Sequence, residues 1–183
     1  MRSRHPEKAP AVVSVCDSSS AMTSLDRFKT AQDESASGFE TVLAEMRAGR
    51  KTSHWIWYIF PQLQGLGQSS MARRYGIHGL PEACEYLSDP VLGERLLNIT
   101  RVVAEKLSLG SRITTLMGSS VDAQKLISSI TLFHHAAGKL GPDGSAPWLA
   151  DFAQLCENIL AAVEAQGYER CFLTLNLLNQ QQA

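Results

Sequence analysis

Apolar residues recur at helical spacing along most of the chain, in segments separated by glycine, proline and serine. One segment places apolar side chains at positions i, i+3, i+4 and i+7, on one helix face, before a glycine that favours a helix end. It consists of Phe39, Val42, Leu43, Met46 and Gly49. A longer helix is predicted after Asp89, because an aspartate that can cap a helix precedes a proline. Its apolar face holds Leu92, Leu96, Ile99, Val103 and Leu107.

Other signals predict further helical segments. Ser24 is the expected cap of the first, which carries Leu25 and Phe28. Others are expected near residues 69–75, 81–87, 111–117, 120–133, 147–167 and 174–178. Residues 138–145, in which two glycines flank Pro142 and Asp143, are expected to form a loop. No segment alternates apolar and polar residues for long enough to predict a sheet, and we find no internal repeat. We therefore predict an all-α fold, a single-domain bundle of about six or seven helices.

The composition is typical of one soluble globular domain. A chain of 183 residues with 44% hydrophobic residues and a net charge of −1 can bury one core and does not resemble a disordered protein. The small net charge favours neither nucleic-acid nor membrane-surface binding. The longest uncharged apolar run, residues 55–63, is far shorter than the roughly 20 residues of a membrane span. We therefore expect no membrane association, and nucleic acid is an unfavoured partner.

The two ends of the chain differ in composition. Residues 1–23 mix basic, proline and serine residues with one short apolar patch, and we expect a flexible N-terminal extension, with a transit peptide as the alternative. Residues 24–183 are expected to form the single helical domain. The four cysteines lie far apart and lack the spacing of metal or redox motifs. We interpret them as reduced thiols, which indicates a cytoplasmic protein.

Candidate chemistry gathers in residues 50–77, where two tryptophans, a tyrosine, a phenylalanine and a histidine adjoin a glycine-rich turn. No acidic residue lies between Glu45 and Glu82, whereas five arginines and lysines do. Such a window predicts an electropositive surface, where basic side chains can hold a phosphate or carboxylate. The turn at residues 65–69 leads into a predicted helix, whose N-terminal N–H groups favour an anion. It matches neither the P-loop nor the dinucleotide-binding motif.

Individual residues have more than one interpretation. His54 is the candidate for proton transfer, because imidazole exchanges protons near neutral pH, and its alternative role is to bridge backbone groups at a helix start. The tryptophans can stack on a ligand or fill the core. Lys125 and Ser129 share a helix face that could point at the same cleft as His54, while Asp122 is an alternative partner for Lys125. The candidate ligand-binding residues are Arg50, Lys51, Trp55, Trp57, Gln62, Gly65, Gly67, Ser69, Arg73, Lys125 and Ser129.

No metal or cofactor is expected. His134 and His135 are adjacent, and adjacent helical residues point about 100° apart, so they do not readily share a metal ion. No serine, histidine and carboxylate set has the context of a hydrolase.

The motif RxGRKxSHWxWxxFPQLxGLGxS over residues 47–69 resembles a family of unknown function, some members of which are labelled calpastatin. The resemblance covers roughly residues 24–178 and continues through Asp122, Lys125 and Ser129. It implies a small, mainly helical single domain and no established activity. Calpain inhibitors of that name are disordered and built of repeats, whereas this chain has one apolar core and no repeat.

Two hypotheses remain for residues 50–77. The first is a pocket that binds a phosphorylated or nucleotide-like small molecule. If this molecule is turned over, His54 is the candidate for proton transfer. The second is a protein-interaction or structural module, in which the aromatic side chains form the core and the arginines form an interface with an unknown protein partner. A pocket lined by His54 and a tryptophan favours the first hypothesis, and a flat or fully packed arrangement favours the second.

Overall fold

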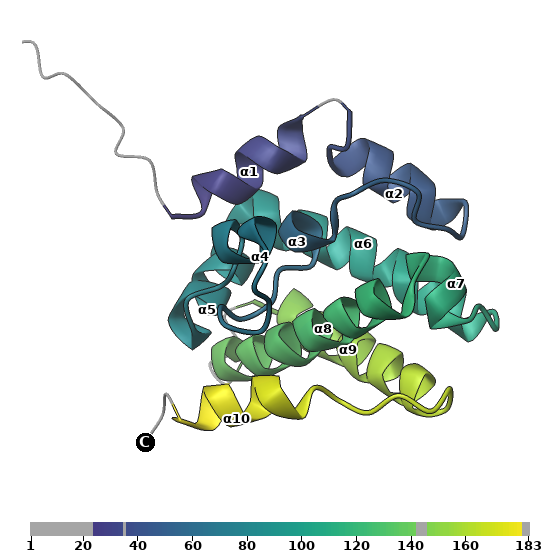
Figure 1. The fold of residues 1–183 in the computed structure, drawn as a ribbon. Coiled ribbons are helices and arrows are strands. Elements are labelled where there is room, and N and C mark those ends of the chain that lie inside the picture. Colours follow the sequence, from purple (N-terminus) through teal and green to yellow (C-terminus); the bar gives the residue numbers. More distant parts are fainter. Residues whose placement is uncertain (1–23, 35, 142–145, 181–183) are drawn as a thin grey trace, which may run out of the picture.

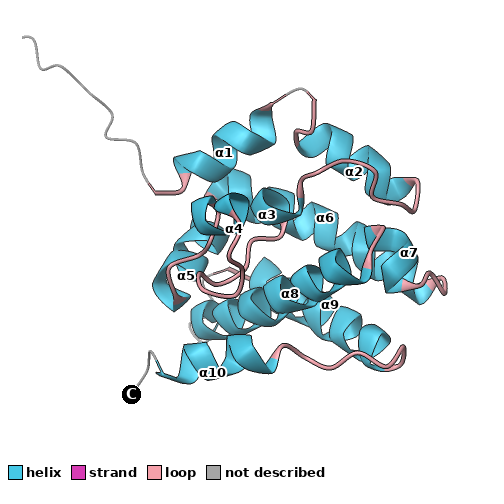
Figure 2. Ribbon diagram, viewed as in Figure 1, coloured by secondary structure: helices cyan, strands magenta, loops and turns pink. Residues whose placement is uncertain are grey.

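The computed structural model describes residues 24–34, 36–141 and 146–180. Within these ranges it contains ten helices, which form one helical domain, and one isolated parallel bridge between Leu63 and Ile77 (Figures 1 and 2). The helices are α1 (Asp26–Asp33), α2 (Phe39–Arg47), α3 (Ile56–Ile59), α4 (Ser70–Arg74), α5 (Leu80–Ser88), α6 (Pro90–Ser108), α7 (Ile113–Met117), α8 (Ser120–Leu140), α9 (Trp148–Glu164) and α10 (Phe172–Gln180).

The predicted all-α bundle is confirmed. Seven of the described helices have at least eight residues, and α3, α4 and α7 are short helices of four or five residues that connect the longer ones. No helix in the described part of the chain is long and apolar enough to span a membrane. The N-terminal extension expected over residues 1–23 lies outside the described residues.

The helix α8 forms the centre of the bundle (Figure 1). It packs against α5, α7, α9 and α10, and α6 packs against α9, α5 and α2. Every residue of α8 from 126 to 133 is buried, so this helix is enclosed on all sides rather than on one stripe. The predicted apolar faces of α2 and α6 are also buried in the core.

Local sequence signals set most helix ends. Asp89 caps α6, because its Oδ1 accepts hydrogen bonds from the N–H groups of Val91 and Leu92, both at 3.1 Å. The same carboxylate pairs with Lys29 of α1 at 2.6 Å, which ties α1 to the start of α6. Gly118 adopts a left-handed conformation with φ of 76° and ends α7.

Two local predictions were wrong. Ser24 is not the cap of α1: Leu25 occupies the N-cap position, and no side chain caps this helix. The loop predicted to begin at Gly138 begins later, because α8 continues to Leu140. A glycine within a helix costs only about 1 kcal/mol, and packing of the half-buried Leu140 against the core favours the longer helix. Residues 142–145 of this loop lie outside the described residues.

The two helical glycines Gly93 and Gly138 provide a matched test of how closely α5 and α6 pack together. A Cβ atom at Gly93 would lie 2.3 Å from the backbone oxygen of Leu87, whereas nothing lies within 4 Å of a Cβ atom at Gly138. We expect Gly93→Ala to lower the free energy of unfolding by about 3 kcal/mol, and Gly138→Ala to raise it by about 0.5–1 kcal/mol. Urea unfolding measures both, and a Gly93→Ala protein as stable as the parent would contradict the close contact between α5 and α6.

Candidate functional site

The loop between α2 and α3 is held by the carboxylate of Glu45. This carboxylate accepts hydrogen bonds from the N–H of Thr52 at 2.9 Å, the hydroxyl of Thr52 at 2.7 Å, the N–H of Ser53 at 3.2 Å and the indole N–H of Trp55 at 2.7 Å. The N–H of Lys51 donates to the backbone oxygen of Leu116 in α7 at 2.8 Å. The segment 51–55 is therefore fixed to two helices at once.

These hydrogen bonds favour the ionised form of Glu45. Burial raises the pKa of its carboxyl group, but the hydrogen bonds from Thr52, Trp55 and Ser53 outweigh this effect and lower the pKa from 4.5 to about 2. The carboxylate is thus a stable acceptor at neutral pH.

A cluster of three charges lies where this loop meets the start of α8. The Lys51 ammonium lies 2.7 Å from Oδ2 of Asp122, and the Lys125 ammonium lies 2.9 Å from Oδ1 of the same carboxylate. The side chains are 9% exposed for Lys51, 16% for Asp122 and 23% for Lys125. Burial raises the pKa of Asp122, but its hydrogen bonds to both lysines outweigh this and lower the pKa below its ordinary value.

Each lysine also lies near a tryptophan ring. The ammonium of Lys51 lies 5.3 Å from the ring centroid of Trp55, and that of Lys125 lies 4.6 Å from the ring centroid of Trp57. Both distances are within the range of a cation–π interaction. Trp57 is half-buried, whereas Trp55 is 0% exposed. Of these two tryptophans, Trp57 is therefore the one that an external molecule can reach.

Trp57 also lines a small hollow in the surface. Gln62, Gly67 and Tyr75 contribute to the wall of this hollow, whose volume is about 10 Å³. That is enough for about one water molecule. A ligand beside Trp57 would consequently lie over this surface rather than inside a closed pocket. His54 does not line this hollow, so the geometry here favours the structural or interaction hypothesis on the criterion stated above.

The structure separates the predicted site residues into three groups: those that lie together, those that face solvent and those that are buried. It brings Lys51, Lys125, Trp57, Gln62 and Gly67 together through the contacts described above. Others face solvent, namely Arg50, His54, Gly65, Ser69 and Arg73.

The buried candidates, and two of those that face solvent, have structural contacts or lie apart from the lysines. Trp55 and Ser129 are both 0% exposed, so neither can contact a ligand in this conformation. Ser69 caps α4, because its hydroxyl accepts from the N–H of Ala72 at 3.1 Å. Arg73 belongs to α4, which lies on the opposite side of α3 from α7 and its partner Lys51 (Figure 1).

Sequence reasoning did not identify two of these interactions. It anticipated the pairing of Asp122 with Lys125 within one helix, but not the second pairing of Asp122 with Lys51. Glu45 was noted only as the last acidic residue before the basic window. No pattern in the sequence indicates either contact, because both depend on how separate elements pack.

Comparisons with known proteins agree with the helical fold. Residues 22–152 match a family described as "Protein of unknown function (DUF1810)". The crystal structure of the conserved hypothetical protein Rv1873 from Mycobacterium tuberculosis is similar, with a TM-score of 0.68 and 39% sequence identity, over 85% of this chain and 96% of that chain. No curated protein matches the chain. Neither description mentions calpastatin or an activity.

Removal of the Glu45 carboxylate is expected to destabilise the protein. Glu45→Ala leaves the buried indole N–H of Trp55 without its acceptor, and an unsatisfied buried donor costs about 1–3 kcal/mol. Urea unfolding at neutral pH should show a loss of about 2 kcal/mol. Glu40→Ala, an exposed position in the same helix, is the control, with an expected change within about 0.5 kcal/mol. Equal effects of the two substitutions would contradict the role of Glu45.

The contribution of Glu45 also depends on pH. Because folding lowers its pKa, its stabilisation is complete above about pH 4.5 and is lost as the pH falls toward about 2. Glu45→Gln, which cannot ionise, should therefore be less stable than the parent at about pH 6, and this difference should shrink as the pH falls to about 3. Urea unfolding of both proteins across this range measures the difference, and a constant difference would show that ionisation of Glu45 does not matter.

Proposed function

The chain belongs to the DUF1810 family, and we propose that this member binds a small anionic molecule, phosphate-like or nucleotide-like, at Lys51 and Lys125 beside Trp57. The ammonium groups of the two lysines would contact the anionic oxygens. The half-buried indole of Trp57 would contact a ring or another apolar part of the ligand.

The sharing of one carboxylate by two lysines is the observation that carries this proposal. Two ammonium groups and one carboxylate leave a net charge of +1 in a partly buried cluster. Asp122 is the one carboxylate within 4 Å of either ammonium in the described part of the chain. Glu45 is also ionised and its charge offsets part of this excess, but its oxygens accept hydrogen bonds from neutral donors and form no ion pair with either lysine. A partly buried positive charge that protein carboxylates compensate only in part favours an anion here.

The donors of the lysines also support the proposal. An ammonium group has three N–H donors, and Asp122 is the acceptor that each of these lysines contacts. Each ammonium group therefore has donors beyond the one that faces Asp122. A phosphate group has several acceptor oxygens and can therefore bridge two such ammonium groups.

The exposed residues next to Lys51 have a secondary role in this proposal. Arg50 and His54 lie in the same loop and face solvent. Arg50 would attract an anion by its charge, and His54 remains the candidate for proton transfer if the bound molecule is turned over. Binding does not require His54, so His54→Ala separates binding from turnover.

The second hypothesis, a structural or interaction module, is favoured by the burial of much of the aromatic segment. Trp55, Tyr58 and Phe60 are all buried in the core. Arg50 and Arg73 remain exposed and could contact a protein partner. This hypothesis assigns the two lysines a structural role, as ion pairs that join the loop to α8 through Asp122, and it predicts no effect of small anions on stability.

A binding screen tests the proposal. Phosphate, sugar phosphates, nucleotides and ADP-ribose are added to the parent protein and to a Lys51→Gln, Lys125→Gln double variant. A ligand at 100 times its Kd stabilises the folded state by about 2.7 kcal/mol, which corresponds to a rise in Tm of roughly 5–10 °C. We expect at least one compound to raise the Tm of the parent, and titration calorimetry to show at least tenfold weaker binding by the double variant.

The matched control is a Lys106→Gln, Lys139→Gln double variant, which removes two lysines of α6 and α8 that lie outside this cluster. It should bind as the parent does, and circular dichroism checks that all variants are folded. The single variant Lys125→Gln retains the pairing of Lys51 with Asp122 and provides a less disruptive test. Absence of any response in the parent, or equal binding by folded Lys51 and Lys125 variants, would contradict the proposal.

A further inference from the structure

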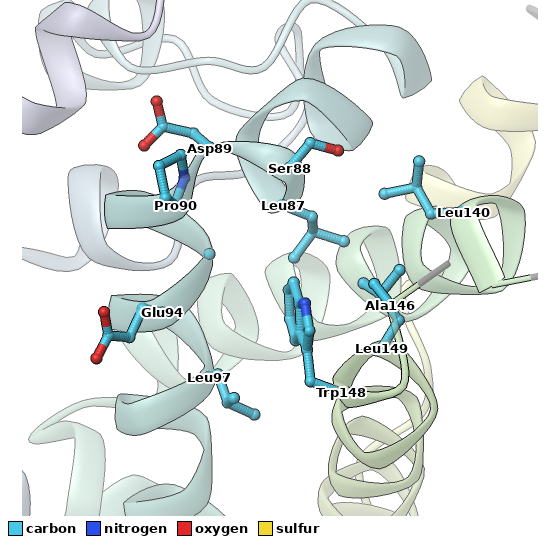
Figure 3. Close-up of a pocket in the computed structure, with 11 residues that line it drawn as sticks. Leu87, Ser88, Asp89, Pro90, Glu94, Leu97, Leu140, Ala146, Trp148 and Leu149 are labelled. Carbon is cyan, nitrogen blue, oxygen red and sulfur yellow. The ribbon is translucent and has the colours of Figure 1, made fainter. Parts of the chain in front are cut away.

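A second concave site lies between the ends of four helices, away from the lysine pair. It is a cavity of about 530 Å³ lined by the end of α5, the first two turns of α6, the end of α8 and the start of α9 (Figure 3). Its volume lies within the range of about 300–1,000 Å³ that is typical of small-molecule sites. No residue proposed above to bind the anion lines this cavity.

The wall of the cavity is mainly apolar. Leucines from all four helices contribute to it, and the half-buried indole of Trp148 stands in its middle (Figure 3). Trp148 lies close to α6, since a Cβ atom at Gly93 would be in contact with its indole ring at 3.4 Å. An apolar molecule with a flat ring could therefore pack against the indole and the leucines.

The charges around the cavity exclude an anionic ligand, and they offer a cation no carboxylate that faces the indole. Asp89 and Glu94 belong to its rim, but in Figure 3 both carboxylates point away from Trp148. The carboxylate of Asp89 is already bound by Lys29 and by the start of α6. No lysine, arginine or histidine is among the described residues that line the cavity. A carboxylate or phosphate would find no counter-charge here, and burial of an uncompensated charge is costly.

Two polar groups at the cavity make no hydrogen bond with described residues, namely the indole N–H of the half-buried Trp148 and the hydroxyl of the exposed Ser88 (Figure 3). Both are open to water. An indole N–H is a donor only, and a hydroxyl can also donate. A ligand that carries an acceptor, such as a carbonyl oxygen, would replace the water at one of them.

We propose that this cavity binds a small, neutral, mainly apolar molecule that has a flat ring and one hydrogen-bond acceptor. The ring packs against the indole of Trp148, and the acceptor receives a hydrogen bond from the indole N–H or from Ser88. This site is independent of the anion site at Lys51 and Lys125.

The fluorescent ketone 6-propionyl-2-(dimethylamino)naphthalene tests the site, because it is neutral, flat and carries a carbonyl acceptor. The chain has three tryptophans, so a two-dimensional NMR spectrum resolves the indole N–H signals by residue, with Trp148→Phe and Trp57→Phe to assign them. We expect saturable one-to-one binding of the probe with a blue shift of its emission. The Trp148 signal should shift, and the Trp57 signal should not. Inorganic phosphate should leave the Trp148 signal unchanged.

Cavity-filling variants provide the second arm of the test. Ala146 lines the cavity and is half-buried, so Ala146→Phe should fill it and weaken probe binding at least tenfold. Ala162→Phe enlarges a half-buried alanine elsewhere on the surface and should bind the probe as the parent does. Non-saturable binding, an unchanged Trp148 signal in the parent, or equal binding by a folded Ala146→Phe protein would overturn the proposal. None of these results depends on whether the lysine pair binds an anion.

Discussion

The carboxylate of Glu45 is the interaction on which the arrangement around the lysine pair depends. It belongs to α2, yet it accepts hydrogen bonds from the loop that leads into α3. These bonds draw the indole of Trp55 into the core and leave Lys51 at the junction of α7 and α8. Without these hydrogen bonds the N–H groups of Thr52 and Ser53 would be bonded only to water, and Lys51 would not be held at this position. The geometry of the charge cluster is therefore a consequence of a partly buried hydrogen-bond acceptor in a different helix.

Asp122 connects this loop to the centre of the fold. It lies in the first turn of α8, where a negative charge is favoured by the helix dipole. It also pairs with lysines from the loop and from the next turn of its own helix. The helix at the centre of the bundle thus begins at the proposed anion site. The apolar cavity lies at the other end of α8, near Leu140, so the two proposed sites use opposite ends of one rigid element.

Features that depend on neighbouring residues could be predicted from the sequence. The apolar face of α2, the cap at Asp89 and the short helix after Ser69 depend on spacing and capping over a few residues, and all are present. The end of α8 was predicted too early, because the propensity of Gly138 was given more weight than the packing of Leu140. Tertiary packing overrides such weak preferences.

The two proposed sites depend on contacts between separate elements, which the sequence did not predict. Lys51, Trp57 and Lys125 were identified as candidates from their type and from the acid-free window. Their proximity was not predictable, because it depends on where α3 and the loop before it pack against α8. Trp148 lies in the segment 147–167, for which the sequence predicted a helix and no site. The cavity beside it depends on the distances between four helix ends, which a one-dimensional pattern does not contain.

The most direct test of the central claim is a crystal structure of the protein grown or soaked with phosphate. The claim is that the two ammonium groups at Asp122 are completed by an anion. It predicts density for a phosphate within about 3 Å of the Nζ atoms of both Lys51 and Lys125, with Asp122 still between them. A well-ordered structure in which both ammonium groups are satisfied by Asp122, other protein groups and water, with no anion present, would contradict it.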